Sequence, residues 1–329
     1  GPLRLAASTY VEIRYWSGPI WLVNCVLVGW LIGRRKVRAV LCVEIAANIV
    51  HIALALALVL GLHWGVAGVA TATLLSEIFK SVLLFAFASR EPAVRLVVSV
   101  ARQRATWAKS SLKALFAINR DLFLRTALLT TALLLITRSG AQQGPVVLAA
   151  NGILFQLFML STLILDGFES AAQVLCGEAI GARDRTRFTS ALRATVISCT
   201  GLAIVLSAIG FVAGDTLSSI FSTDPEVVKT AARYAFWLGI LPLAGFASFV
   251  LDGVFVGAGW TRSMLGTMLV AMGVYVTLLF TLGSLANDGL WLAFALFFVV
   301  RALGQIAVLP RLMHRDFGKG HINGGATPA

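Results

Sequence analysis

The sequence predicts an all-α integral membrane protein. Hydrophobic residues make up 58% of the chain and charged residues only 13%, whereas soluble domains carry roughly 25% charged residues. Nine apolar runs reach or approach the length that spans a bilayer as a helix, and the short alternating strands of a membrane barrel are not visible. We expect membrane spans at residues 15–33, 39–62, 65–89, 121–138, 146–176, 192–214, 232–258, 263–283 and 288–310.

The net charge of +12 follows the loops between these spans. Lys and Arg gather after the first, third, fifth, seventh and ninth spans, and the alternate loops hold few of them. Because cytoplasmic loops carry the excess of basic residues, this pattern predicts a multi-pass protein with a cytoplasmic C-terminus. It also explains the basic charge without any nucleic-acid partner.

A stretch near the start of the chain recurs near its end at a fixed offset of 224 residues. Long-period repeats of apolar helices are typical of secondary transporters built from two related halves. The second copy follows three helices of its own half, while the first follows none. We therefore expect nine visible helices of a twelve-helix, two-bundle protein that lacks its first three helices. The matched pairs are Tyr10 with Tyr234, Gly29 with Gly253, Gly33 with Gly257, Arg38 with Arg262, Leu41 with Leu265, and Gly65 with Gly289.

Each copy carries a proline and a pair of glycines within its apolar run. Pro19 and Pro242 remove a backbone hydrogen bond and predict kinked helices. The pairs Gly29-xxx-Gly33 and Gly253-xxx-Gly257 each present a small face that allows another helix to approach closely.

The polar residues between the spans divide the chain into four parts. We expect a partial N-terminal bundle of three helices at 1–90, a cytoplasmic linker at 91–117, a six-helix bundle at 118–313 and a disordered cytoplasmic tail at 314–329. Part of the linker has the alternation of basic and apolar residues that is typical of an interfacial helix.

Ionisable side chains are costly in hydrocarbon, which makes each of them a functional candidate. Glu44, Asn48 and His51 lie on one stripe of the second span. His51 should lie at the depth of Thr73 on the returning helix, and Glu77 at about the depth of Asn48. The cluster is either an ion or substrate site, in which His51 titrates near neutral pH, or a set of hydrogen bonds that only joins helices.

The second half repeats the phrase Leu-Asp-Gly at 165–167 and 251–253. Asp166, Glu169 and Asp252 are the best candidates for acids that face a cavity. The alternative is that they cap kinked helices or lie near water.

The phrase Asn119-Arg120-Asp121 opens the fourth span. We expect a structural role in which Asn119 caps the helix, Asp121 complements the helix dipole and Arg125 pairs with Asp121.

Other chemistries find no support in the sequence. No catalytic or metal-ligand constellation and no nucleotide-binding loop emerges, so we expect neither an enzyme nor a resident cofactor. The four cysteines lie in or beside apolar segments without metal spacing and suit packing.

Seven phrases along the chain match one known family of transporters. They are Glu12-Ile-Arg14, Gly29-Trp-Leu-Ile-Gly33, Asn119-Arg-Asp-Leu-Phe-Leu-Arg125, Leu148-Ala-Ala-Asn151, Leu165-Asp-Gly-Phe168, Gly181-Ala-Arg-Asp184 and Leu251-Asp-Gly253. On these phrases the chain resembles the multidrug and toxic compound extrusion (MATE) family, in its DinF-like branch. The resemblance implies helices four to twelve of a twelve-helix antiporter in the bacterial inner membrane, which exports organic cations by alternating access, driven by H⁺ or Na⁺. We expect a monomer that binds small organic cations within the lipid bilayer.

The chain departs from the family at the coupling residues that the resemblance implies. His51 and Ala55 stand where the branch usually has Asn and Asp, Thr73 is retained, and Gln173 replaces a usual Glu. One hypothesis is that His51 takes over proton coupling. The alternatives are a flippase for lipid-linked oligosaccharides, and a non-transporting membrane scaffold or remnant.

Overall fold

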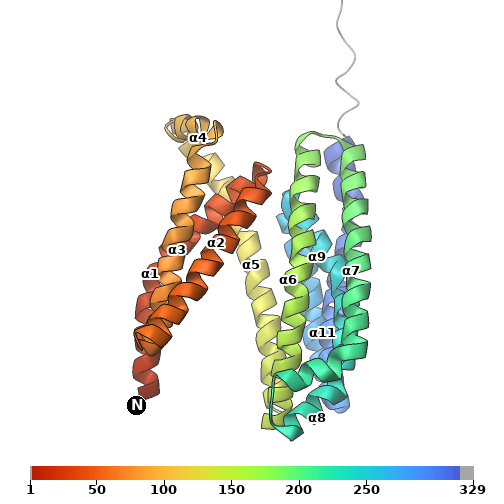
Figure 1. The fold of residues 1–329 in the computed structure, drawn as a ribbon. Helices are drawn as coiled ribbons and strands as arrows, with labels where there is room; N and C mark the ends of the chain where they lie inside the picture. Colours follow the sequence, from red (N-terminus) through yellow and green to blue (C-terminus); the bar gives the residue numbers. More distant parts are fainter. Residues whose placement is uncertain (1, 319–329) are drawn as a thin grey trace, which may run out of the picture. The chain divides into compact units, whose positions relative to one another are not determined.

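The structure, a computed structural model, describes residues 2–318 and contains helices and turns but no strand within them (Figure 1). Nine helical segments of this range are long and apolar enough to cross a membrane, which confirms the predicted fold class. The α-helices are α1 (Pro2–Gly33), α2 (Val37–Leu56), α3 (Gly65–Ser89), α4 (Ala93–Ala101), α5 (Lys109–Ala141), α6 (Pro145–Gly181), α7 (Arg185–Ile220), α8 (Pro225–Tyr234), α9 (Phe236–Gly257), α10 (Thr261–Thr281) and α11 (Ala286–Phe317).

The chain divides into two compact units, Gly1–Ser111 (unit 1) and Leu112–Ala329 (unit 2). The division falls within 91–117, the segment predicted to be a linker. The short helix α4 and a 3-10 turn at Arg104–Trp107 occupy much of that segment.

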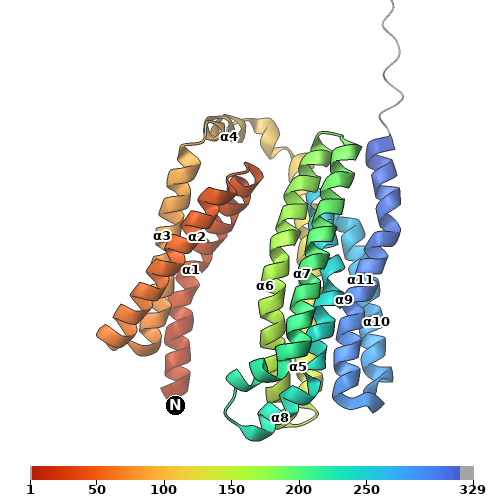
Figure 2. The same ribbon diagram turned by 45° about the vertical axis from the view of Figure 1, so that its right-hand side comes forward.

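Unit 1 is built on α3, against which both α1 and α2 pack (Figure 2). Its buried apolar cluster holds Leu31, Val40, Val43 and Leu84. The end of α2 continues as a π-helical turn, Ala57–Gly61.

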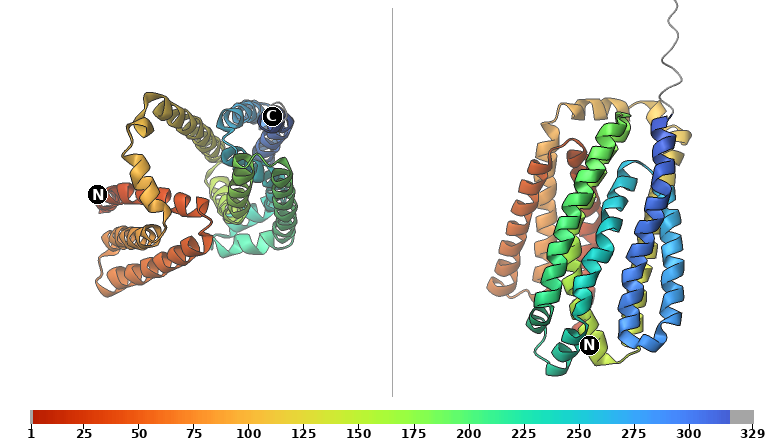
Figure 3. Two further views of the ribbon diagram at one scale, coloured as in Figure 1. Left: turned by 90° about the horizontal axis from the view of Figure 1, so that it is seen from above. Right: turned by 90° about the vertical axis from the view of Figure 1, so that its right-hand side faces the viewer.

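Unit 2 contains a helix break that the apolar pattern does not reveal. The predicted span 232–258 is two elements, α8 and α9, which part at Ala235. Asp224 caps α8 by accepting a hydrogen bond from the Glu226 amide at 3.0 Å, and Pro225 takes the first helical position, where its missing amide is harmless. The helix pair α10 and α11 closes unit 2 as an antiparallel hairpin (Figure 3).

Glycines bring α9 very close to α6. A Cβ added to Gly253 would lie 2.1 Å from the Glu169 carbonyl oxygen, and one added to Gly257 would lie 2.2 Å from the Gln173 carbonyl oxygen. The second glycine pair is therefore a helix contact, as predicted. The first pair is not one among the described residues, since a Cβ at Gly29 or Gly33 meets nothing within 4 Å.

The backbone repeats at the offset of 224 residues. Helix α1 ends at Gly33 and α9 ends at Gly257, and α2 and α10 each begin four residues later. In the intervening turns, Arg35 and Gly259 both take a positive φ, of 60° and 72°. Helices α1 and α9 thus end at equivalent positions of the repeat, and the turns that follow them share a conformation, although the side chains of the two copies differ.

Several helices extend beyond the predicted spans, and two of these extensions change predictions made for particular residues. Helix α5 begins at Lys109 because Lys, Leu and Ala favour helix and no Gly or Pro interrupts 109–120. Asn119 is consequently inside the helix, where its side-chain amide donates to the Leu115 carbonyl at 2.8 Å, so the predicted N-cap at Asn119 is wrong. Asp121 lies in the same helix interior, too far from the first turn for the predicted interaction with the helix dipole.

At the other end of unit 2, α11 continues through 314–317, part of the predicted disordered tail. Asp316 accepts a hydrogen bond from the Trp260 indole at 2.7 Å, and Phe317 packs against Phe188 with ring centroids 5.4 Å apart. These contacts hold the last turn in place. Residues 319–329 lie outside the described residues.

Candidate functional site

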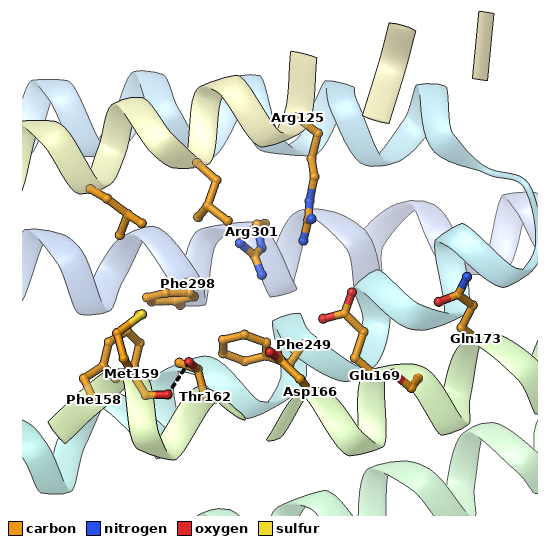
Figure 4. A pocket seen from close by; sticks show the side chains of 13 residues that line it. Arg125, Phe158, Met159, Thr162, Asp166, Glu169, Gln173, Phe249, Phe298 and Arg301 are labelled. Carbon is orange, nitrogen blue, oxygen red and sulfur yellow. Dashed lines mark hydrogen bonds between the residues drawn. The ribbon is translucent and has the colours of Figure 1, made fainter. Parts of the chain in front are cut away.

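Unit 2 contains a partly open cavity of about 460 Å³ between α5, α6, α9 and α11 (Figure 4). Helix α6 contributes the largest share of its wall. The lining residues are Arg125, Leu129, Leu133, Phe158, Met159, Thr162, Asp166, Glu169, Ser170, Gln173, Phe249, Phe298 and Arg301.

The acidic wall of the cavity is one stripe of α6. Thr162, Asp166, Glu169 and Gln173 follow one another at three- or four-residue intervals, which places them on one helix face. Neither Asp166 nor Glu169 has a hydrogen-bond or ion-pair partner among the described residues. The glycine contacts with α9 fix this part of α6, because they engage the carbonyl groups of Glu169 and Gln173 themselves.

Asp252 of α9 forms ion pairs with two arginines that line the cavity. Its carboxylate is completely buried, accepts hydrogen bonds from Arg125 and from Gln305 Nε2 at 2.7 Å, and forms an ion pair with Arg301 Nη2 at 3.0 Å. Breaking a buried ion pair by removing one partner is strongly destabilising. Asp252 therefore fixes the guanidinium groups that reach the cavity.

Arg301 is surrounded by aromatic rings. Its Cζ lies 5.3 Å from the ring centroid of Phe298, 5.8 Å from that of Phe297 and 6.0 Å from that of Phe249, distances at which a cation is attracted to the ring face. Nη2 of Arg301 also donates to Ser248 Oγ at 3.0 Å. The rings of Phe249 and Phe298 line the cavity together with Arg301.

The structure brings the predicted acids of this half together but gives them different surroundings. Asp166 and Glu169 line the cavity, whereas Asp252 is not part of its lining and lies behind the two arginines. The expectation that Asp252 faces a cavity is corrected accordingly, since the paired guanidinium groups cover its carboxylate.

Arg125 belongs to this site and not to the start of α5. The predicted pair between Arg125 and Asp121 is wrong, because Arg125 binds Asp252 instead. Asp121 pairs with the neighbouring Arg120, whose Nη2 lies 2.8 Å from Asp121 Oδ1.

The predicted polar cluster of unit 1 is split into separate contacts. His51 Nε2 lies 3.1 Å from Thr73 Oγ1, as their equal depth led us to expect. The Thr73 hydroxyl also donates to the Val69 carbonyl at 3.0 Å, which leaves its oxygen to accept from His51 when Nε2 carries the proton. Among the described residues, the side chain of Asn48 donates to the Glu44 carbonyl of its own helix, at 2.8 Å, and has no hydrogen bond with Glu77.

Glu77 instead contacts Asn24 of α1, which is not among the predicted site residues. Asn24, which is 1% exposed, donates to Glu77 Oε2 at 2.7 Å, and Ser81 donates to Asn24 Oδ1 at 2.5 Å. Glu44 instead pairs with Lys80 at 2.6 Å.

Sequence reasoning missed Arg301, Ser248 and Gln305, yet a signal for them was present. At the repeat offset of 224, Asn24 corresponds to Ser248, Glu77 to Arg301 and Ser81 to Gln305. The joined pair Asn24 and Glu77 of unit 1 thus corresponds to the joined pair Ser248 and Arg301 of unit 2. Equivalent positions carry a carboxylate in one unit and a guanidinium group in the other.

The site can attract a cation. Three carboxylates, of Asp166, Glu169 and Asp252, face two guanidinium groups, of Arg125 and Arg301, which leaves one excess negative charge when all are ionised. Aromatic rings in the wall favour a flat, apolar, positively charged body. Within the described residues no group of three or more His, Cys, Asp and Glu side chains is arranged to hold a metal ion.

Comparisons of the sequence find relatives along almost the whole chain. The MatE family model matches residues 122–281. DNA damage-inducible protein F of Escherichia coli (strain K12) is 33% identical over 305 residues, which are 93% of this chain and 66% of that protein. Multidrug and toxin extrusion protein 1 of Homo sapiens is 27% identical over 301 residues, 86% of this chain and 50% of that protein.

Solved structures share the fold. An outward-facing conformation of a multidrug resistance MATE family transporter matches with a TM-score of 0.83 at 16% identity, over 92% of this chain and 69% of that one. The crystal structure of the eukaryotic MATE transporter AtDTX14 matches with a TM-score of 0.75 at 18% identity, over 89% of this chain and 67% of that one. The chain spans between half and two thirds of the length of its curated relatives named above.

Proposed function

We propose, since the chain belongs to the MATE family of multidrug and toxin efflux transporters, that it acts in the export of organic cations and binds them in the cavity of unit 2. Its relatives are transporters rather than enzymes. Relatives such as Multidrug export protein MepA of Staphylococcus haemolyticus carry names of drug export, so the flippase alternative is not favoured.

The observation that carries this proposal is the pair of unpartnered carboxylates on α6. Asp166 and Glu169 lie in a cavity of about 460 Å³ whose wall includes the rings of Phe158, Phe249 and Phe298. Ligand cavities of several hundred Å³ with mostly apolar walls and a few placed polar groups are typical for molecules of drug size. A carboxylate without a partner inside an apolar span is costly, and a bound organic cation offsets that cost.

Coupling to H⁺ or Na⁺ would use the same carboxylates that bind the substrate cation. A small cation that enters from the outside and a substrate cation that leaves from the inside both favour ionised carboxylates, so occupancy by one weakens binding of the other. His51 of unit 1 is the second candidate for the coupling residue. Its contact with Thr73 at 3.1 Å supports this role, because protonation of His51 would add a charge in unit 1. In either case the gradient drives transport only if cation binding shifts the balance between two conformations.

Neutralising the two acids is expected to abolish export. In proteoliposomes that hold the full-length product and a cationic dye, Asp166→Asn or Glu169→Gln should each lower the rate of dye efflux driven by a proton or sodium gradient by about tenfold or more, as for loss of one charged contact. The double variant should fall to the rate of empty liposomes. In the same assay, His51→Gln should lose only the part of efflux that depends on the proton gradient.

The matched control is Asp215→Asn, which removes an exposed carboxylate of α7 away from the cavity. It should leave efflux at the parental rate. Parental rates in the double variant would overturn the assignment of the cavity, and a parent that exports no dye under either gradient would overturn the exporter assignment.

A further inference from the structure

Several nitrogen atoms of the two arginines lack a hydrogen-bond partner in the described part of the chain. Arg301 is 2% exposed, and among its nitrogen atoms Nη2 alone has partners in the described residues, an ion pair with Asp252 and a hydrogen bond to Ser248. Nε and Nη1 of Arg301 and Nε of Arg125 are buried without a partner. Buried polar groups are paired in the great majority of cases, so these donors call for a physical explanation.

The unpartnered donors lie beside the cavity that the acids face. Arg125 and Arg301 both line it, from α5 and α11, while Asp166 and Glu169 line it from α6. In Figure 4 the guanidinium groups and the carboxylate of Glu169 point into the same space from different helices. The cavity therefore has two poles, a carboxylate pole on α6 and a guanidinium pole formed by Arg125 and Arg301.

We propose that the guanidinium pole is an anion-recognising subsite, which takes the carboxylate or sulfonate of an amphipathic substrate whose cationic group lies at the carboxylate pole. The inference rests on the proposed function and adds a second contact to it. A cation alone would leave the donors of Arg301 unpaired. An anion alone would add to the excess negative charge of the site.

The geometry also restricts the shape of such a substrate. The rings of Phe249 and Phe298 lie 6.0 and 5.3 Å from Arg301 Cζ and line the same cavity. An aromatic body that carries its acid group at one edge would therefore contact these rings while its acid accepts hydrogen bonds from Arg301. Charge-assisted bonds of guanidinium to carboxylate are among the stronger contacts available to proteins.

Two dyes separate this proposal from simple cation binding. Rhodamine 110 and its methyl ester, rhodamine 123, share one cationic xanthene body, but only rhodamine 110 carries a free carboxylate. Binding of each to the purified full-length product is measured by fluorescence polarisation. We expect rhodamine 110 to bind about tenfold more tightly, as for one hydrogen bond to a charged group.

Substitutions of Arg301 test its role in the preference for rhodamine 110. The preference should vanish in Arg301→Gln and shrink in Arg301→Lys, which keeps the charge but not the planar set of donors. Glu169→Gln, the matched control, should weaken both dyes alike and leave their ratio unchanged. Because the readout is a ratio within one protein sample, a loss of folded protein does not imitate it, and Arg301→Lys decides if Arg301→Gln does not fold.

Equal affinity of the two dyes for the parent, or a ratio that persists in both Arg301 variants, would overturn the subsite. If the parent binds neither dye, the proposed cation cavity fails as well. Binding of rhodamine 123 without a preference for rhodamine 110 would leave the proposed function standing and reject only the anion subsite.

Discussion

Gly253→Ala is expected to destabilise unit 2 by about 3 kcal/mol, at the upper end of what overpacking costs. The added methyl group would lie 2.1 Å from the Glu169 carbonyl oxygen. That atom belongs to the backbone of a long helix, so no side chain can turn aside and the two helices must separate. Thermal unfolding of the detergent-solubilised full-length product, followed by tryptophan fluorescence, measures the loss.

Gly273→Ala is the control for this substitution. It adds the same methyl group to α10 of the same unit, where nothing lies within 4 Å. Alanine favours helix over glycine by about 1 kcal/mol, so this variant should match the parent or exceed it. Similar unfolding temperatures for the two variants would contradict the close contact of α6 with α9.

The second large effect is expected at Asp252. Asp252→Ala should cost about 3–5 kcal/mol, the range for removing one partner of a buried ion pair. It leaves Arg125 and Arg301 facing each other, the second of them 2% exposed. The same unfolding assay measures the loss, and dye binding should fall with it because the guanidinium groups are no longer held.

Asp121→Ala provides the comparison. Asp121 is also a buried aspartate paired with an arginine, but the side chain of Arg120 is 66% exposed and water replaces the lost partner. Exposed pairs contribute about 0–1 kcal/mol, so this variant should remain close to the parent. An Asp252→Ala variant as stable as Asp121→Ala would show that the arginines do not depend on Asp252.

The sequence predicted the membrane spans because apolar length decides them almost alone. The break at Ala235 escaped prediction because neither Gly nor Pro marks it. It depends on packing between helices, where Gly214 approaches Ala235 and Gly210 approaches Leu238. Such contacts join residues that are distant in sequence and have no local pattern.

The site was predictable in part. Asp166 and Glu169 were predicted as site residues because a carboxylate within an apolar span costs free energy in whichever direction its side chain points. The partner of Arg125 was not found, since Asp252 lies 127 residues away and Asp121 offered a nearer choice. Arg301 could have been reached from Glu77 through the repeat offset, because the two copies keep the position and reverse the charge.

The most direct test of the cavity is protection of an introduced thiol. Ser170 lines the cavity and is exposed to it, so Ser170→Cys is made in a background without native cysteines, including Cys25, Cys42, Cys176 and Cys199. Ser219→Cys, on an exposed part of α7, is the labelling control.

We expect a water-soluble maleimide to label both positions. Tetraphenylphosphonium at about ten times its Kd should slow labelling at Ser170→Cys about tenfold by mass action and leave Ser219→Cys unchanged. The protection should disappear when Asp166→Asn and Glu169→Gln are added. A Ser170→Cys variant that resists labelling while Ser219→Cys reacts, or that reacts at one rate with and without the cation, would contradict a cation-binding cavity in unit 2.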